Sequence, residues 1–186
     1  MKTKAFLILI LALITVSCSS SKPYVEGLDN NNFSKEQNIL IANLNEEGIT
    51  VVSDWAMPLL DNTLNDLSNS GLLGIGNNAS RINLIGNQNY LTIKNDSIIA
   101  DLPYYGVRTS GGGYNTDTGI EINQPLENYQ IKSGKKNTIV ITLDASSGTE
   151  SYDITLRLNA KTGYSSIFIS STQRRSISYT GSITDE

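Results

Sequence analysis

The stretch IVITLDASSGTESYDITLRLNAKTGYSSIFI, residues 139–169, decides the fold. Within it Tyr152, Ile154, Leu156 and Leu158 alternate with polar residues. A period of two is typical of a β-strand with one face buried and the other in water. Polar turn residues occur on both sides of this strand, at 146–148 and 159–163. The pattern therefore predicts consecutive antiparallel hairpins.

Similar apolar runs extend outward from this stretch in both directions, separated by short polar turns. They predict strands over 49–57, 81–85, 90–93, 98–102, 119–122, 129–132, 139–143, 152–158, 167–169 and 177–179. Asn95-Asp96, between two such runs, predicts a tight hairpin. No helix-length periodic stretch lies between the strands, so a parallel α/β sheet is not expected. The predicted fold class is mainly β: an antiparallel β-sandwich or barrel-like meander with a short N-terminal helix.

The helix is predicted over 35–46. Ser34 is placed as its N-cap and Gln37 stands in the capping-box position three residues later. An apolar stripe follows, made of Ile39, Leu40, Ala42 and Leu44, and Gly48 is the expected stop. Between the first two strands, the leucine-containing segment 59–78 is expected to be an ordered insertion that packs its leucines on the sheet edge.

The first residues are typical of a lipoprotein leader. Lys2 and Lys4 precede an apolar run, 5–16, that is too short to span a bilayer. Ser17 then precedes Cys18, the single cysteine of the chain, and a small residue before a cysteine at this place resembles the bacterial lipobox. The expected organisation is a signal peptide over 1–17, a lipidated Cys18 with a flexible tether over 18–33, and one β-rich domain over 34–186.

Composition argues against several classes of function. The chain has 14 Lys and Arg against 18 Asp and Glu, a formal net charge of −4, and no histidine. A basic patch that would bind nucleic acid is not evident. The usual proton shuttle near neutral pH is absent, and Cys18 is expected to carry lipid, so nucleophilic catalysis lacks an activating base. We therefore expect a protein that is not an enzyme and that needs no cofactor or metal.

Three segments together resemble a known family. They are Asp101-Leu102-Pro103-Tyr104-Tyr105-Gly106 with the glycine-rich stretch after it, Gly119-Ile120-Glu121-Ile122, and 171–181, STQRRSISYTG. This combination resembles the Bacteroidetes lipoproteins catalogued as domain of unknown function 4251, from about Gly48 to the C-terminus. The sequence departs from that pattern at Tyr105, where Phe is common, and at 173–175, where Asn-Arg-Gln is more usual.

The resemblance implies a fold and a cellular address but no activity. It implies a lipoprotein of the bacterial cell envelope. Lipoproteins of this kind that are exported to the surface resemble one another in having acidic residues directly after the cysteine. In this chain the first acidic residue after Cys18 is Glu26. The expected location is thus the outer membrane, facing the periplasm, held by acyl chains such as palmitate on Cys18.

The best candidate binding loop lies around the glycine-rich stretch, with Tyr104, Tyr105 and Tyr114. Tyrosines supply contact area at low entropic cost. The alternative is that Tyr104 and Tyr105 pack over one end of a barrel. Arg174 and Arg175 could bind a carboxylate or phosphate; alternatively, one is solvated and the other pairs with a carboxylate of the sheet.

Weaker candidates accompany this loop. Asp54, Asp101 and Glu121 could supply the carboxylate pair of a glycoside hydrolase. Oxygen donors over 115–121 resemble a hard-cation loop, with a polar turn as the alternative that we favour. Asp96-Ser97-Ile98 resembles an O-glycosylation acceptor in Bacteroidetes, with Ser97 as the modified residue and a plain turn as the alternative.

Three functions follow as hypotheses. The first is a non-catalytic binding or envelope-maintenance module, with an envelope protein or a glycan as partner and Tyr104–Tyr114 as the contact loop. The second is a small hydrolase of envelope or glycan substrates, for which two carboxylates would converge in a pocket. The third is a carrier of a small apolar ligand, for which a barrel would enclose a large apolar cavity.

Overall fold

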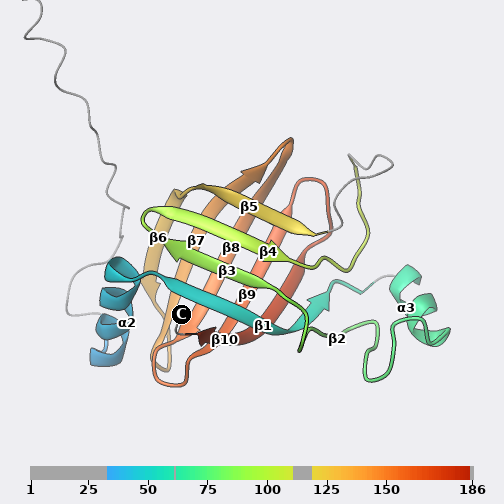
Figure 1. Ribbon diagram of the computed structural model, residues 1–186, viewed down its shortest axis with the longest axis horizontal. Coiled ribbons are helices and arrows are strands. Elements are labelled where there is room, and N and C mark those ends of the chain that lie inside the picture. The colour runs from blue at the N-terminus through green and yellow to red at the C-terminus, as the bar shows by residue number, and fades with distance from the viewer. Residues whose placement is uncertain (1–32, 61, 111–118, 185–186) are drawn as a thin grey trace, which may run out of the picture.

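The computed structural model describes residues 33–60, 62–110 and 119–184, in which ten β-strands form one antiparallel sheet nearly closed into a barrel (Figure 1). The elements are α2 (Lys35–Glu46), β1 (Ile49–Pro58), α3 (Asn62–Asn69), β2 (Ile82–Asn83), β3 (Tyr90–Lys94), β4 (Ser97–Leu102), β5 (Ile120–Pro125), β6 (Glu127–Ser133), β7 (Thr138–Ser147), β8 (Glu150–Asn159), β9 (Tyr164–Ser171) and β10 (Ile177–Thr184). The predicted fold class is confirmed.

The strand order is β5-β4-β3-β1-β10-β9-β8-β7-β6, and β2 pairs with β1 away from this path. Neighbours in the order are mostly consecutive hairpins, as in a meander. The exception is β1, which pairs with β3 on one side and with the last strand, β10, on the other. The first strand therefore joins the two halves of the sheet.

The two halves form two layers (Figure 1). Strands β1, β3, β4 and β5 lie in front of β6–β9 and cross their direction, while β10 runs antiparallel beside β1 where the two halves join. We call β1, β3, β4 and β5 the front layer and β6–β10 the back layer. At the seam, the side-chain Oε1 of Gln124 on β5 accepts hydrogen bonds from the amide and hydroxyl of Ser146 at the end of β7, at 2.9 and 3.0 Å. A side chain thus bridges the seam where β5 approaches β7.

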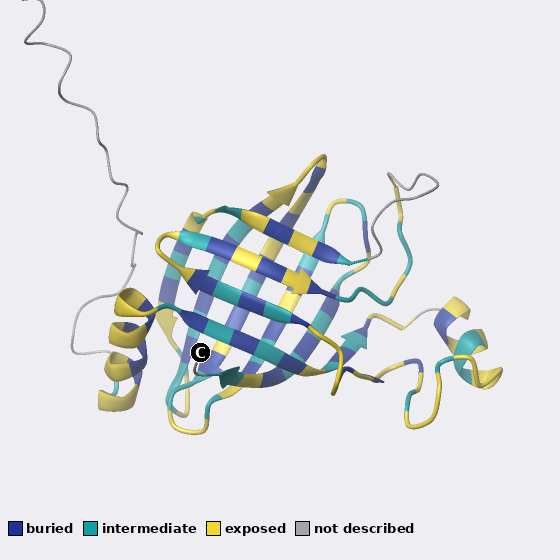
Figure 2. Cartoon of the chain, in the orientation of Figure 1, coloured by how far each residue is buried: buried dark blue, intermediate teal, exposed yellow. Residues whose placement is uncertain are grey.

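The apolar side chains of the predicted alternating strands fill the space between the two layers. Buried residues alternate with half-buried or exposed ones along nearly every strand (Figure 2). The most deeply buried side chains include Leu91, Ile98, Leu102, Ile139, Ile141, Ile154, Leu156 and Tyr179. Aliphatic side chains from both layers thus form one continuous core in the interior.

Helix α2 closes one end of the barrel and has the predicted bounds. The capping box between Ser34 and Gln37 is present. The Gln37 side chain is buried and donates to the carbonyls of Gly134 and Thr138 at 3.3 and 2.7 Å, which ties the helix to the β6–β7 turn. The predicted apolar stripe was partly wrong, because Ile39 and Ala42 are exposed while Ile41 is buried with Leu40 and Leu44.

The predicted hairpin at 95–96 is confirmed. Asn95 and Asp96 have φ values of 51° and 59°, the left-handed conformation that a two-residue hairpin turn requires. The strand predicted over 81–85 is shorter, β2. The side chain of Asn77 accepts from the Asn83 amide and the side chain of Asn83 accepts from the Ile85 amide, both at 2.8 Å. Side-chain acceptors thus take the place of the sheet ladder.

The insertion after β1 extends away from the barrel (Figure 1). Its leucines do not pack on the sheet edge as predicted, because Leu59, Leu60 and Leu72 are exposed and Leu64 alone among those predicted is classed as buried. Leu64 lies on α3, so the short helix buries one leucine, while Leu67 and Leu73 are half-buried. Within the described segments, no helix has the length and apolar content needed to cross a membrane.

Candidate functional site

Two of the predicted tyrosines and one of the predicted arginines lie together at one end of the barrel. They are Tyr104, Tyr105 and Arg174. Tyr104 and Tyr105 are half-buried. The Tyr104 hydroxyl is 3.0 Å from the carbonyl oxygen of Arg175 and 3.2 Å from that of Val107. The guanidinium of Arg174 lies 5.1 Å from the centre of the Tyr104 ring, within cation–π distance.

Glu150, at the start of β8, is the centre of a buried ionic cluster. Its carboxylate is 3.0 Å from Nε of Arg174 and 2.8 Å from Nη2 of Arg108, and it also accepts from the Ser171 hydroxyl. Burial alone would raise the pKa of Glu150, but the Ser171 hydrogen bond and the Arg174 charge outweigh it, so the pKa lies below its ordinary value. Glu150 is therefore held as the anion that two arginines share.

The cluster fastens two distant segments together. Thr109 donates its amide to the Gln173 carbonyl at 2.8 Å, and Arg175 donates to the Val107 carbonyl at 3.2 Å. Nη1 of Arg174 also donates to the Gly119 carbonyl at 2.6 Å. Segments 107–110 and 173–175 thus pair as a short backbone clasp at the barrel end.

Tyr179 completes this arrangement from inside the barrel. Its buried hydroxyl donates to the Pro103 carbonyl at 2.9 Å. Burial, and next the neighbouring Tyr104, raise the pKa of Tyr179 well above its ordinary value. Burial also raises the pKa of Tyr152 to about 12, with Glu150 as the second cause. Both phenols are neutral hydrogen-bonding groups of the core across the physiological range.

The other site residues predicted from the sequence do not belong to the Glu150 cluster. Arg175 is exposed, so of the two arginines one pairs with a sheet carboxylate and the other faces solvent. Tyr114 and residues 115–118 of the predicted cation loop over 115–121 lie outside the described residues. Ser97 is half-buried at the start of β4, with its hydroxyl 3.5 Å from the Asn95 carbonyl. In the described part of the chain, no three metal-ligating side chains of the His, Cys, Asp or Glu type come together.

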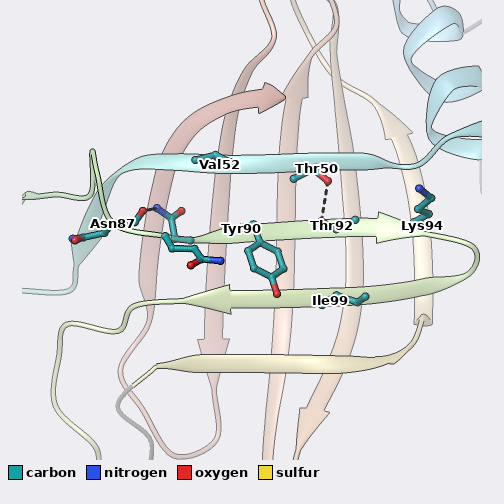
Figure 3. A pocket seen from close by; sticks show the side chains of 9 residues that line it. Thr50, Val52, Asn87, Tyr90, Thr92, Lys94 and Ile99 are labelled. Carbon is teal, nitrogen blue, oxygen red and sulfur yellow. Dashed lines mark hydrogen bonds between the residues drawn. The ribbon is translucent and has the colours of Figure 1, made fainter. Parts of the chain in front are cut away.

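A groove on the outer face of the front layer offers a different site (Figure 3). Its volume is about 630 Å³, within the range of small-molecule sites. We call it the outer groove, and its lining is Thr50, Val52, Asn87, Gln88, Asn89, Tyr90, Thr92, Lys94 and Ile99. These residues come from β1, β3, β4 and the segment that leads into β3.

The tyrosine on its floor is Tyr90. Figure 3 shows the Tyr90 ring extending from β3 toward β4, with Ile99 farther along that strand. Tyr90 is half-buried, and Ile99 is 39% exposed. Across from them, the Thr50 and Thr92 hydroxyls lie 2.9 Å apart. The groove thus combines an aromatic and aliphatic floor with hydroxyl and amide groups.

The rim of the groove is held by Asn89. Strand β1 has a bulge between Ser53 and Trp55, and its pairing with β3 stops at Val51. The buried Asn89 side chain accepts from the Ser53 amide at 2.9 Å and donates to the Ser53 carbonyl at 3.0 Å. It replaces the missing ladder bonds, so the segment that leads into Tyr90 is fixed before any ligand arrives.

A second hollow of about 490 Å³ adjoins the groove over β4 and β5. It holds two of the predicted carboxylates, because Asp101 and Glu121 are directly opposite each other in the β4–β5 register. Both are exposed. The third, Asp54, lies in the β1 bulge and is exposed there, outside both hollows.

Tyr90 is not among the site residues predicted from the sequence, although the sequence contains a signal for it. In Tyr90-Leu91-Thr92-Ile93-Lys94 the buried positions are Leu91 and Ile93. The alternation therefore places Tyr90 on the outer face, among polar residues. A large aromatic on the polar face of a strand is thus the sequence signal that marked Tyr90 as a surface residue.

Comparison with known proteins gives a family and a fold. The profile described as "Domain of unknown function (DUF4251)" matches residues 32–183. A crystal structure of a DUF4251 family protein from Bacteroides eggerthii DSM 20697 is similar at a TM-score of 0.51 and 13% identity, covering 80% of this chain and 86% of that one. No curated protein matches. The predicted DUF4251 family is confirmed, while lipid attachment and an origin in Bacteroidetes stay predictions.

Proposed function

This chain belongs to the DUF4251 family, and on that premise we propose that it is a non-catalytic, membrane-anchored module of the bacterial envelope that binds a glycan in the outer groove. The observation that carries the proposal is the Tyr90 ring, half-buried on the floor of a preformed groove and surrounded by hydroxyl and amide groups.

The chemistry of the lining suits a sugar. An aromatic ring and an aliphatic side chain, here Tyr90 and Ile99, present a flat apolar surface to the C–H face of a pyranose. Amides such as Asn87 and Gln88 supply both donors and acceptors to hydroxyl groups, and the threonine hydroxyls can act as either. This balance of apolar floor and few polar groups is typical of small-ligand sites.

The outer groove replaces the Tyr104–Tyr114 loop as the proposed contact surface. Tyr104 and Arg174 are engaged with the barrel end and with Glu150, so their side chains serve packing. The first hypothesis from the sequence, a binding module, is kept, and its contact surface moves from the Tyr104–Tyr114 loop to the outer face of β1, β3 and β4.

The test is calorimetric titration of the purified protein with tetrasaccharides of N-acetylglucosamine and of glucose. Tyr90→Ala is the test variant, and Tyr90→Phe keeps the ring. Tyr164→Ala is the matched control, because Tyr164 is an exposed tyrosine on β9 of the back layer. We expect Tyr90→Ala to weaken binding at least about tenfold, which equals about 1.4 kcal/mol. Tyr90→Phe and Tyr164→Ala should bind within about twofold of the wild type.

Two results would overturn the proposal. One is that neither tetrasaccharide binds at millimolar concentration. The other is that Tyr90→Ala and Tyr164→Ala lose affinity equally, since the groove would then have no special part. Thermal melting of each variant separates loss of the site from loss of the fold.

A glycoside hydrolase is the second candidate, because Asp101 and Glu121 face each other across β4 and β5 in one hollow. Directly opposed residues of an antiparallel pair have Cβ atoms about 5 Å apart, so both carboxylates lie on the same face of adjacent strands, as a pair that flanks a glycosidic bond would. Both of these side chains are exposed, however, whereas the general acid of a glycosidase lies in a buried apolar setting. Release of reducing ends from the tetrasaccharides, lost in Glu121→Gln, would favour this candidate over pure binding.

Membrane attachment through Cys18 completes the proposed function. Two or more acyl chains hold a protein on a bilayer stably, whereas one gives marginal affinity. We expect wild-type protein to incorporate a palmitate analogue and to fractionate with the outer membrane, and Cys18→Ser to do neither. Proteolysis of intact cells then distinguishes a periplasmic domain, which is protected, from a surface domain.

A further inference from the structure

We infer that the outer groove and the adjoining hollow are two parts of one binding trough, which takes an extended, linear oligosaccharide and rejects acidic ones. This inference rests on the proposed function and specifies its ligand class. It concerns the region from β1 across β3 and β4 to β5.

The two hollows share their central residues. Tyr90 and Ile99 line both the outer groove and the hollow over β4 and β5. A ligand that stacks on Tyr90 is therefore in position to continue into either side. The far end of the second hollow is bounded by Ser146–Gly148, where β7 turns into β8.

The strand register arranges the outer side chains in rows that run across the sheet. Tyr90 pairs with Asp101, and Asp101 pairs with Glu121. In the next row, Thr92 pairs with Ile99, and Ile99 pairs with Asn123.

These rows set the length of the trough. Neighbouring strands are about 4.8 Å apart, so β1 to β5 spans roughly 14 Å, and the β7–β8 turn adds to this. A ligand lying along these rows must be longer than a single sugar.

The charge of the second hollow sets the specificity. Asp101 and Glu121 are exposed and opposite each other, and like charges at such positions are destabilising in a sheet. They accept hydrogen bonds from sugar hydroxyls and repel a carboxylate or sulfate. Asn123 adds a neutral donor and acceptor beside them. The second hollow thus disfavours an anionic chain, although Lys94 adds one positive charge to the lining of the outer groove.

The experiment is calorimetry at low salt with N-acetylglucosamine dimer, tetramer and hexamer, and with a galacturonic acid hexamer as the acidic probe. We expect the hexamer to bind the wild type at least about tenfold more tightly than the dimer. Asn123→Ala should weaken the hexamer and leave the dimer unchanged, whereas Tyr90→Ala should weaken both. The double variant Asp101→Asn with Glu121→Gln should gain affinity for the acidic hexamer.

Asp153→Asn is the control, because Asp153 is an exposed carboxylate on β8 in the back layer and should leave every affinity unchanged. Equal affinity for dimer and hexamer would overturn the single trough and leave the proposed function intact. Equal affinity of the wild type for the acidic and neutral hexamers would overturn the specificity. If no oligosaccharide binds, the proposed function fails, and this inference fails with it.

Discussion

Replacing Glu150 by glutamine should be among the most destabilising conservative substitutions in this barrel. The change removes one negative charge and keeps the size and shape of the side chain. It leaves Arg108 and Arg174, both within 3.0 Å of the carboxylate in the native protein, as two neighbouring cations without their shared anion. The Arg174 side chain is only 5% exposed, so water cannot replace the lost partner.

The magnitude follows from the burial of the cluster. Breaking a buried ion pair by removing one partner costs about 3–5 kcal/mol. A domain of this kind is stable by about 5–15 kcal/mol, so the loss is a large fraction of the total. With a urea m-value of about 2 kcal/mol per molar, the unfolding midpoint should fall by roughly 2 M.

The assay is urea unfolding followed by the fluorescence of Trp55, the single tryptophan of the chain. Asp153→Asn is the charge-matched control, since it removes a carboxylate from the exposed face of the same strand, and it should change stability by less than about 0.5 kcal/mol. A further Arg174→Met change in the Glu150→Gln background should cost less than in the wild type, because the pair is coupled. Equal midpoints for Glu150→Gln and Asp153→Asn would refute the reasoning that this cluster holds the barrel end.

Three other predictions use the same assay. Gly181→Ala should destabilise by at least about 2 kcal/mol, because a Cβ there would lie 2.0 Å from the Val52 carbonyl oxygen at the β1 bulge; a wild-type midpoint would contradict the close approach. Asn89→Ala should cost about 1–3 kcal/mol by leaving the buried backbone groups of Ser53 unpaired, and should weaken sugar binding as the rim loosens; unchanged stability would show that Asn89 is dispensable. The pKa of Glu150 is lower in the folded state, so its stabilisation is present above its unfolded pKa of about 4.3 and is lost as the pH falls through the folded value. The free energy of unfolding of the wild type should therefore fall more steeply in acid than that of Glu150→Gln. Parallel pH profiles would argue against this linkage.

The sequence predicted the fold more completely than the site. Tyr104 and Arg174 were candidates because tyrosines and arginines often bind ligands. The same properties suit them to the barrel end, where an aromatic ring with a polar tip covers the core and a guanidinium pairs with Glu150. Residue type alone does not distinguish these uses, because the decisive partner, Glu150, is 24 residues away from Arg174 in the chain.

Local features of the structure, by contrast, could be predicted from the sequence. Alternation along β8, the capping box of Ser34 and Gln37, and the Asn95-Asp96 turn each depend on neighbours a few residues away. They determine which segments are strands, which residues face inward and where the chain reverses. The sequence by itself therefore determined a mainly β meander with a short helix at its start.

The placement of β1 between β3 and β10 was decided only by the tertiary structure. That placement joins the two layers and brings Thr50 of β1 beside Thr92 of β3, with Tyr90 and Ile99 close by. The pairing depends on how well whole faces of apolar side chains fill one interior, a property shared by residues far apart in the chain. Periodicity encodes which face of a strand is buried, but the neighbour against which that strand lies is set by the packing of the complete core.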